Sequence, residues 1–173
     1  NLASAMATKA YLQVEGKERP KLELGDDPDK TGEYQMTFRV VNFGTEPLQY
    51  AITPTVLTEN AETKGDYGNV QVYFATQTSR DITAQTTWTT NCANNVVTVP
   101  AKGTADVTVT VKLSDALRKE LTDTFENGIY IEGYITLKQQ ATAEGVTGCD
   151  LSIPYLAFYG DWDQAPVIDI GYY

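Results

Sequence analysis

The sequence has 173 residues, the length of one domain, and its 13 Lys and Arg against 23 Asp and Glu give a net charge of −10 at pH 7. An acidic chain repels phosphate backbones and anionic lipid surfaces, which argues against binding to nucleic acid or to a membrane surface. The chain has no His, which removes the commonest general base, the Ser-His-Asp triad and most zinc sites. We therefore expect no catalytic residues, no metal site and no cofactor in this chain. No stretch approaches the ~20 apolar residues of a membrane-spanning helix, so no membrane insertion is expected.

Residues 1–12 differ from the sequence that follows them. Leu2, Met6 and several alanines form a small-residue stretch with helical spacing, which predicts the C-terminal end of a preceding domain. From residue 13 the apolar period changes to two, the period of half-buried strands. We expect a β domain over residues 13–165 and the start of a linker to a following domain over residues 166–173.

Alternating apolar residues predict the strands of this domain in chain order. The predicted strands cover residues 22–24, 36–40, 48–56, 70–74, 97–99, 107–113, 129–137 and 151–157. Pro54 indicates a sheet edge or a bulge in the third of them, because Pro has no N–H to donate. Phe38, Val109, Ile131 and Ile153 lie on the apolar parity of their strands and should point inward. The polar stretch 77–95 carries no strand signal.

One short helix interrupts the strands. Ser114 is a suitable N-cap, Leu117, Leu121 and Phe125 share one face, and Asn127-Gly128 provides an end signal. There is no strand–helix–strand alternation of the kind that builds parallel sheets. About seven short strands in antiparallel order with one short helix therefore predict an all-β sandwich.

The segment Asp27-Pro-Asp29-Lys-Thr-Gly32 matches the first half of a calcium-binding loop. The match fails at the position of the bidentate Glu, which is Phe38 inside a predicted strand. A solvated acidic hairpin loop is therefore favoured over a calcium site.

Trp88, Trp162, Tyr172 and Tyr173 allow two interpretations. They could form stacking platforms for a sugar ring, but aromatic residues of β-sandwiches are more often core or interface residues. Because no motif brings these rings to one face, packing is favoured.

Cys92 and Cys149 also leave two alternatives open. They form either one disulfide of an exported protein or two buried thiols. Ser, Thr and Lys are plentiful, but no nucleophile motif such as S-x-x-K or G-x-S-x-G occurs.

Four segments resemble a known family. Residues 1–12 (NLASAMATKAYL) resemble the final helix of a subtilisin-like catalytic domain. Residues 40–50 (VVNFGTEPLQY) resemble the V-x-N-x-G-x-x-x-L-x-Y hairpin of the fibronectin-III-like domain that follows it. Residues 127–135 and 153–162 resemble the last two strands of that domain. The family is the large cell-envelope subtilases, which include lactocepin-type proteinases and complement-cleaving surface peptidases.

The resemblance implies a fibronectin-III/immunoglobulin-like fold and an accessory role. In that family the catalytic triad lies in the preceding domain, and none of its residues falls on this sequence. The implied partners are the catalytic domain of the same chain and protein substrates. The implied location is extracellular, on the cell wall or cell surface, which adds modest weight to a Cys92–Cys149 disulfide. The alternative from another class is a free-standing adhesive or carbohydrate-binding sandwich.

The corner Gly160-Asp161-Trp162 ends the last of these segments. Gly160 can adopt backbone angles closed to other residues, and Asp161 can accept a backbone hydrogen bond as in Asx turns. We expect Trp162 to pack back onto the domain or its neighbour, and to hold the final strand in place rather than contact substrate.

Overall fold

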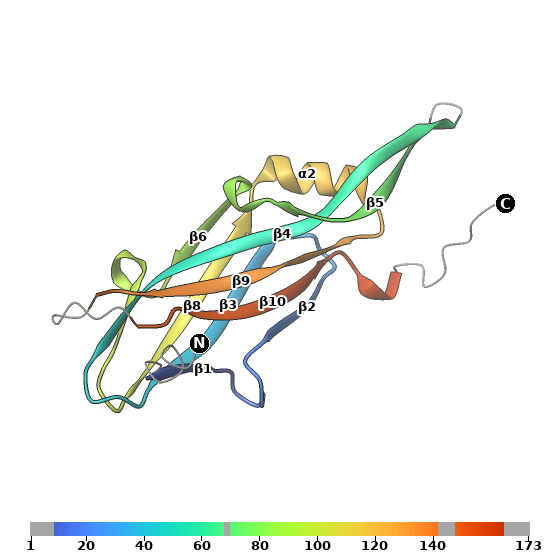
Figure 1. Cartoon of the computed structure of the whole chain (residues 1–173). Coiled ribbons are helices and arrows are strands. Elements are labelled where there is room, and N and C mark those ends of the chain that lie inside the picture. Colours follow the sequence, from blue (N-terminus) through green and yellow to red (C-terminus); the bar gives the residue numbers. More distant parts are fainter. Residues whose placement is uncertain (1–8, 68–69, 142–147, 165–173) are drawn as a thin grey trace.

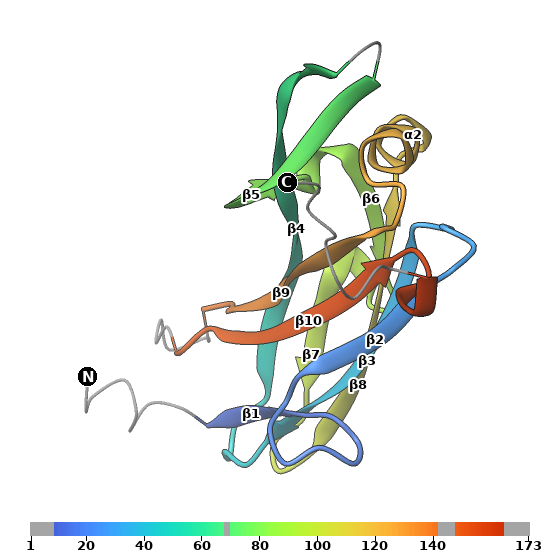
Figure 2. The ribbon, with the colours of Figure 1, turned by 90° about the vertical axis from the view of Figure 1, so that its right-hand side faces the viewer.

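Two facing β-sheets make up the structure, a computed structural model that describes residues 9–67, 70–141 and 148–164 (Figures 1 and 2). The smaller sheet contains, in spatial order, β1 (Ala10–Gln13), β3 (Glu33–Asn42), β8 (Thr104–Leu113) and β6 (Thr86–Thr90). The larger sheet contains, in spatial order, β2 (Leu22–Asp27), β10 (Leu151–Tyr159), β9 (Ile129–Gln139), β4 (Leu48–Tyr67) and β5 (Val70–Asp81), and β7 (Val96–Val99) also pairs with β4. The remaining elements are α2 (Asp115–Thr124) and the 3-10 turns η1 (Thr83–Gln85), η2 (Ala93–Asn95) and η3 (Trp162–Gln164).

The predicted all-β sandwich with one short helix is confirmed, with two differences. The described residues form ten strands rather than about seven. They are also not all antiparallel, because β2 joins the edge of the larger sheet parallel to β10.

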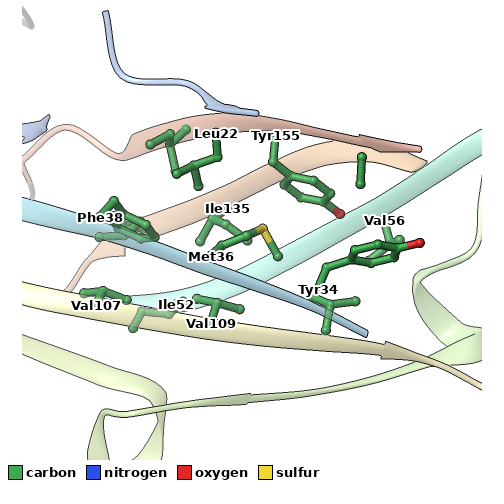
Figure 3. Close-up of a cluster of buried hydrophobic side chains, with 14 of the residues drawn as sticks. Leu22, Tyr34, Met36, Phe38, Ile52, Val56, Val107, Val109, Ile135 and Tyr155 are labelled. Atoms are coloured by element: carbon green, nitrogen blue, oxygen red, sulfur yellow. The ribbon is translucent and has the colours of Figure 1, made fainter. Parts of the chain in front are cut away.

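The core lies between the two sheets and is built by alternation (Figure 3). Met36, Phe38 and Val40 of β3 point inward and are buried, while the residues between them are exposed. Val109, Ile131 and Ile153 are fully buried, so the predicted inward parity is confirmed for all four marker residues. Burial of each such side chain contributes roughly 1.5–3 kcal/mol, which makes this interface the main source of stability.

Two strands of the smaller sheet are not predicted by the sequence pattern. Residues 10–12, predicted to be helical, lie in β1, where Ala10 pairs with Asn42 and Leu12 with Val40 of β3. Pairing with β3 therefore overrides the helical pattern, and Ala10 and Leu12 are buried on the period of a strand. Residues 1–8 lie outside the described residues. The predicted domain boundaries are not tested by the structure.

The second missed strand is β6, whose sequence is Thr-Thr-Trp-Thr-Thr. It carries one apolar residue in five positions, so it shows no alternation, and it is a strand because it pairs with β8. β5 likewise continues to Asp81, beyond the predicted end near residue 74.

Pro54 occupies a place where β4 needs no hydrogen-bond donor. On one side β4 pairs continuously with β9. On the other side it pairs with β7 up to Ala51 and with β5 from Leu57 onward. Pro54 lies in the interval between these two partners, so the predicted edge exists locally within an inner strand.

The V-x-N-x-G segment owes its structure to Asn42, which is buried at the end of β3. Its Nδ2 atom donates hydrogen bonds to the carbonyl oxygens of Glu46 (2.8 Å) and Val99 (3.3 Å), and its Oδ1 atom accepts one from Gly44 N (2.9 Å). One side chain thus ties the β3–β4 turn to the end of β7.

The helix α2 begins as predicted and ends earlier than predicted. The Ser114 hydroxyl accepts a hydrogen bond from Leu117 N (3.2 Å), and Leu117 and Leu121 are buried. The helix ends at Thr124, before Asn127-Gly128, with Phe125 as its C-cap.

Beyond the part of β4 that pairs with β9, β4 and β5 continue as a two-stranded ribbon that projects from the sandwich (Figures 1 and 2).

Candidate functional site

The end of the larger sheet carries two adjacent rows of side chains that face opposite ways. Asp26 of β2, Phe158 of β10 and Tyr130 of β9 are register partners and form the outer row. The next positions along the same strands, Asp27, Tyr159 and Ile129, form the inner row and are buried. Side chains that are partners across a sheet share a face, so each row acts as a unit.

A bulge in β2 decides which aspartate faces inward. Leu156 pairs with Glu23 and Ala157 pairs with Gly25, so Leu24 is an extra residue in β2. Gly25 has a φ of +76°, a backbone conformation that residues other than glycine adopt only with strain. The bulge shifts the alternation by one residue, and Asp27 instead of Asp26 therefore turns toward the core.

The carboxylate of Asp27 is the centre of the inner row. It accepts hydrogen bonds from Thr31 N (2.9 Å), the Thr31 hydroxyl (3.0 Å), Gly32 N (2.9 Å) and the Tyr34 hydroxyl (3.1 Å). Asp27 is only 8% exposed. The predicted solvated acidic loop is therefore wrong for Asp27, because its oxygens face the loop's own donors.

The same contacts occupy the Asp27 oxygens that the calcium-loop pattern would require as ligands. Both Asp27 oxygens are engaged, Asp29 is exposed, and Phe38 points into the core. No group of three or more His, Cys, Asp or Glu side chains arranged for a metal ion occurs within residues 9–67, 70–141 and 148–164.

Helix α2 is fastened to the inner row. The Tyr159 hydroxyl donates to Arg118 O (3.1 Å), and the Arg118 guanidinium donates to Lys30 O from two nitrogens (2.8 and 3.1 Å). Burial, and then the negative charge of Asp27, raise the pKa of Tyr34, so this tyrosine keeps its proton. Asp27, Tyr159 and their hydrogen-bond partners thus form a satisfied polar network with a structural role.

The residues of the outer row line a surface hollow of about 400 Å³. The apolar part of its lining includes Tyr130, Leu156, Phe158 and Trp162. We call this surface feature the aromatic hollow. The Trp162 ring lies 5.1 Å from Phe158 in an edge-to-face arrangement and 5.5 Å from Tyr130, measured between ring centroids. Three carboxylate residues also line it: Glu23, Asp26 and Asp163.

The Gly160-Asp161-Trp162 corner places Trp162 in this hollow. Gly160 has a φ of +136°, and Asp161 Oδ1 accepts a hydrogen bond from Asp163 N (3.0 Å), which is the predicted Asx turn. Trp162 packs back onto the domain, as predicted, yet it remains 53% exposed. The turn residues predicted the corner from sequence. The partner rings of Trp162, Tyr130 and Phe158, had no local signal, because the register of β9 and β10 brings them there.

Of the other candidate aromatics, only Trp88 lies within the described residues, and it does not join this site. Trp88 lies on β6 of the smaller sheet, partly buried against the core, and Tyr172 and Tyr173 lie outside the described residues. Trp88 and Trp162 therefore form no common platform, since they lie against different sheets.

The two cysteines are not joined by a disulfide. The Cys92 thiol lies 3.4 Å from Asn91 Oδ1, and burial raises its pKa, so it is not an activated thiolate.

Within the described residues, no helix is both long and apolar enough to cross a membrane.

A second exposed aromatic pair lies elsewhere on the molecule. Tyr11 of β1 and Phe43 of the β3–β4 turn have ring centroids 6.3 Å apart, and each is 49% exposed. β1 lies at the end of the sandwich opposite to α2 (Figures 1 and 2). Neither ring had a local signal in the sequence, because the pattern around Tyr11 predicts a helix and the pattern around Phe43 predicts only a turn.

Comparison with known proteins identifies similar sequences. A family model described as an Fn3-like domain matches residues 22–156. The C5a peptidase of Streptococcus pyogenes is 26% identical over 165 residues, which is 95% of this chain and 12% of that protein. The PI-type proteinase of Lactococcus lactis subsp. cremoris is 25% identical over 150 residues, which is 87% of this chain and 7% of that protein. These matches confirm the resemblance found in the sequence.

Solved structures show a more distant likeness. PapD-like domain 7 of human CEP192 has a TM-score of 0.44 and 10% identity, covering 87% of this chain and 83% of that chain. A likeness at this level indicates nothing about function. The chain itself spans about 12% of the length of the C5a peptidase that it matches.

Proposed function

The chain belongs to the Fn3-like domain family, and from this premise we propose that it is a non-catalytic accessory domain of a secreted or cell-surface subtilisin-like serine endopeptidase. The observation that carries the proposal is the match of 95% of this chain to 12% of a C5a peptidase. A match of that shape is expected when the chain corresponds to one domain of a much longer peptidase.

The chemistry of the chain supports a non-catalytic role. A serine nucleophile needs a base within hydrogen-bond reach, and this sequence contains no His. Among the described residues, the buried carboxylate of Asp27 is occupied by loop and tyrosine donors. In the proposed function, peptide hydrolysis therefore belongs to another domain of the parent.

The proposed partner is the catalytic domain of the same chain, and the proposed contact surface is the Tyr11–Phe43 pair. Two large rings that are each half exposed and adjacent are typical of an interface. Tyr11 lies in β1, the first strand of the described chain. Supporting the catalytic domain and guiding protein substrates is then the domain's role.

The test uses the parent protein and the 173-residue protein side by side. We expect a serine-directed fluorophosphonate to label the parent and not the 173-residue protein. Stoichiometric labelling of the 173-residue protein, or a parent sequence without Asp, His and Ser triad motifs, would contradict the proposal.

The contact surface is tested separately in the parent. Tyr11→Ser with Phe43→Ser should lower the temperature at which peptidase activity is lost. The matched control is Tyr11→Phe with Phe43→Tyr, which changes the same two positions but keeps both rings and should leave that temperature unchanged. Equal effects of the two changes would place the interface elsewhere.

A further inference from the structure

Every charged side chain that lines the aromatic hollow, among the described residues, is a carboxylate. Glu23 is already paired with Lys17 (2.8 Å) and Lys21 (2.9 Å). Asp26 and Asp163 line the same hollow, and neither forms an ion pair within the described part of the chain. Two unneutralised negative charges therefore face a concave aromatic surface.

The rings supply the second element of a cation site. The faces of aromatic rings carry negative charge density and attract Lys or Arg within about 6 Å of the centroid, Trp being the strongest of the three. Tyr130, Phe158 and Trp162 meet edge-to-face or tilted, and Trp162 is half exposed. Phe158 is only 7% exposed, so the accessible ring surface belongs to Trp162 and Tyr130. An Arg side chain can stack its methylenes and guanidinium on these two rings while its N–H groups reach the carboxylates.

The surface beside the hollow fits the rest of a protein segment. Leu156 of β10 is 41% exposed and Tyr134 of β9 is 42% exposed. Both belong to the face of the two strands that carries Phe158 and Tyr130, because strand side chains alternate and these positions differ by two or four residues. Leu156 and Tyr134 thus extend the surface from the hollow along the sheet, and we call them the Leu156–Tyr134 strip. The exposed carboxylate of Glu132 lies on the same face, opposite Leu156 in the register.

We propose that the aromatic hollow binds a Lys or Arg side chain carried by a protein segment, with apolar neighbours of that residue lying on the Leu156–Tyr134 strip. Charge complementarity selects this occupant over a sugar. A sugar hydroxyl donates only a neutral hydrogen bond to these carboxylates, whereas a Lys or Arg side chain also offsets their negative charge. The net charge of −10 also favours the approach of cationic segments.

The test measures binding of defined peptides to the 173-residue protein by NMR titration of backbone amides. The probe is acetyl-Gly-Leu-Arg-Leu-Gly-amide, and its matched control carries citrulline, which has nearly the shape of Arg without the charge. We expect shifts at Asp26, Tyr130 and Trp162 with the Arg peptide, and binding about tenfold weaker with citrulline. Binding should also weaken as salt is raised.

Variants of the protein locate the site. Asp26→Asn with Asp163→Asn should weaken binding about tenfold, because both free charges are lost. The control Glu33→Gln with Glu46→Gln changes the net charge equally at two exposed residues that do not line the hollow, and it should bind like wild type. Glu23→Gln should weaken binding less than the double Asp variant does, since Glu23 is already paired with two lysines.

Three outcomes would overturn the proposal. These are equal binding of the Arg and citrulline peptides, equal binding by the double Asp variant and its control, and hollow shifts produced by chitotriose but not by the Arg peptide. This inference does not depend on the parent protease, so its failure would leave the proposed accessory role intact.

Discussion

Asp26 and Asp27 are neighbours in the chain and have opposite surroundings. Asp27 is buried and accepts four hydrogen bonds, whereas Asp26 lines an open hollow and has no ion pair within the described residues. The same division extends across the sheet, with Tyr159 and Ile129 on the inner face and Phe158 and Tyr130 on the outer face, where Trp162 packs on Phe158. One face of the sheet end stabilises the fold, and the other face is available for recognition.

The largest expected effect is the replacement of Asp27. An Asn would keep one acceptor oxygen and turn an NH₂ group toward N–H and O–H donors. We expect Asp27→Asn to lower the free energy of unfolding by about 2–4 kcal/mol. Urea denaturation measures this loss. The matched control is Asp26→Asn, for which we expect a change within about 0.5 kcal/mol. Equal losses would show that the assignment of inner and outer faces is wrong.

The bulge that separates the two aspartates gives the next effect. A Cβ at Gly25 would meet nothing within 4 Å, so the positive φ is the source of the cost. Gly25→Ala should cost about 1–2 kcal/mol, and Gly25→Asn less, because Asn tolerates this region of backbone conformation. The comparison is made by urea denaturation. Wild-type stability in the Ala variant would argue against the bulge.

Trp162→Ala tests the outer row with a smaller expected effect. The ring contacts Phe158 and Tyr130 but stays half exposed, so its removal should cost about 1 kcal/mol. That corresponds to about 2–4 °C in melting temperature for a domain of this size. In the same variant we expect loss of Arg-peptide binding. A large loss of stability with unchanged binding would make Trp162 a structural residue only.

The smallest effect concerns Glu23, at the surface beside the hollow. Its hydrogen bond and ion pair with Lys17, and then those with Lys21, lower its pKa from the ordinary 4.5 to about 2. A lowered pKa in the folded state stabilises the fold above pH 4.5, and this contribution is lost as the pH falls toward 2. Wild type should therefore melt slightly higher than Glu23→Gln at pH 7, and this difference should vanish near pH 2. At 1 M salt it should also vanish at pH 7.

Much of the fold could be predicted from local patterns. The alternation in residues 36–40 and 107–113 has the period of a strand, and burial of one face then follows without knowledge of the partners. The cap at Ser114 and the Asx turn at Asp161 are likewise local, because the donor and acceptor lie within three residues of each other. The family resemblance rested on such segments.

Two strands and the candidate site could not be predicted, because long-range pairing creates them. β1 and β6 are strands through pairing with β3 and β8, since their own sequences lack the signal. Tyr130 and Trp162 meet because β9 and β10 pair in one particular register. Alternation alone cannot say which of two adjacent aspartates is buried. A bulge at Gly25, formed only when β2 pairs with β10, shifts the alternation by one residue and decides it.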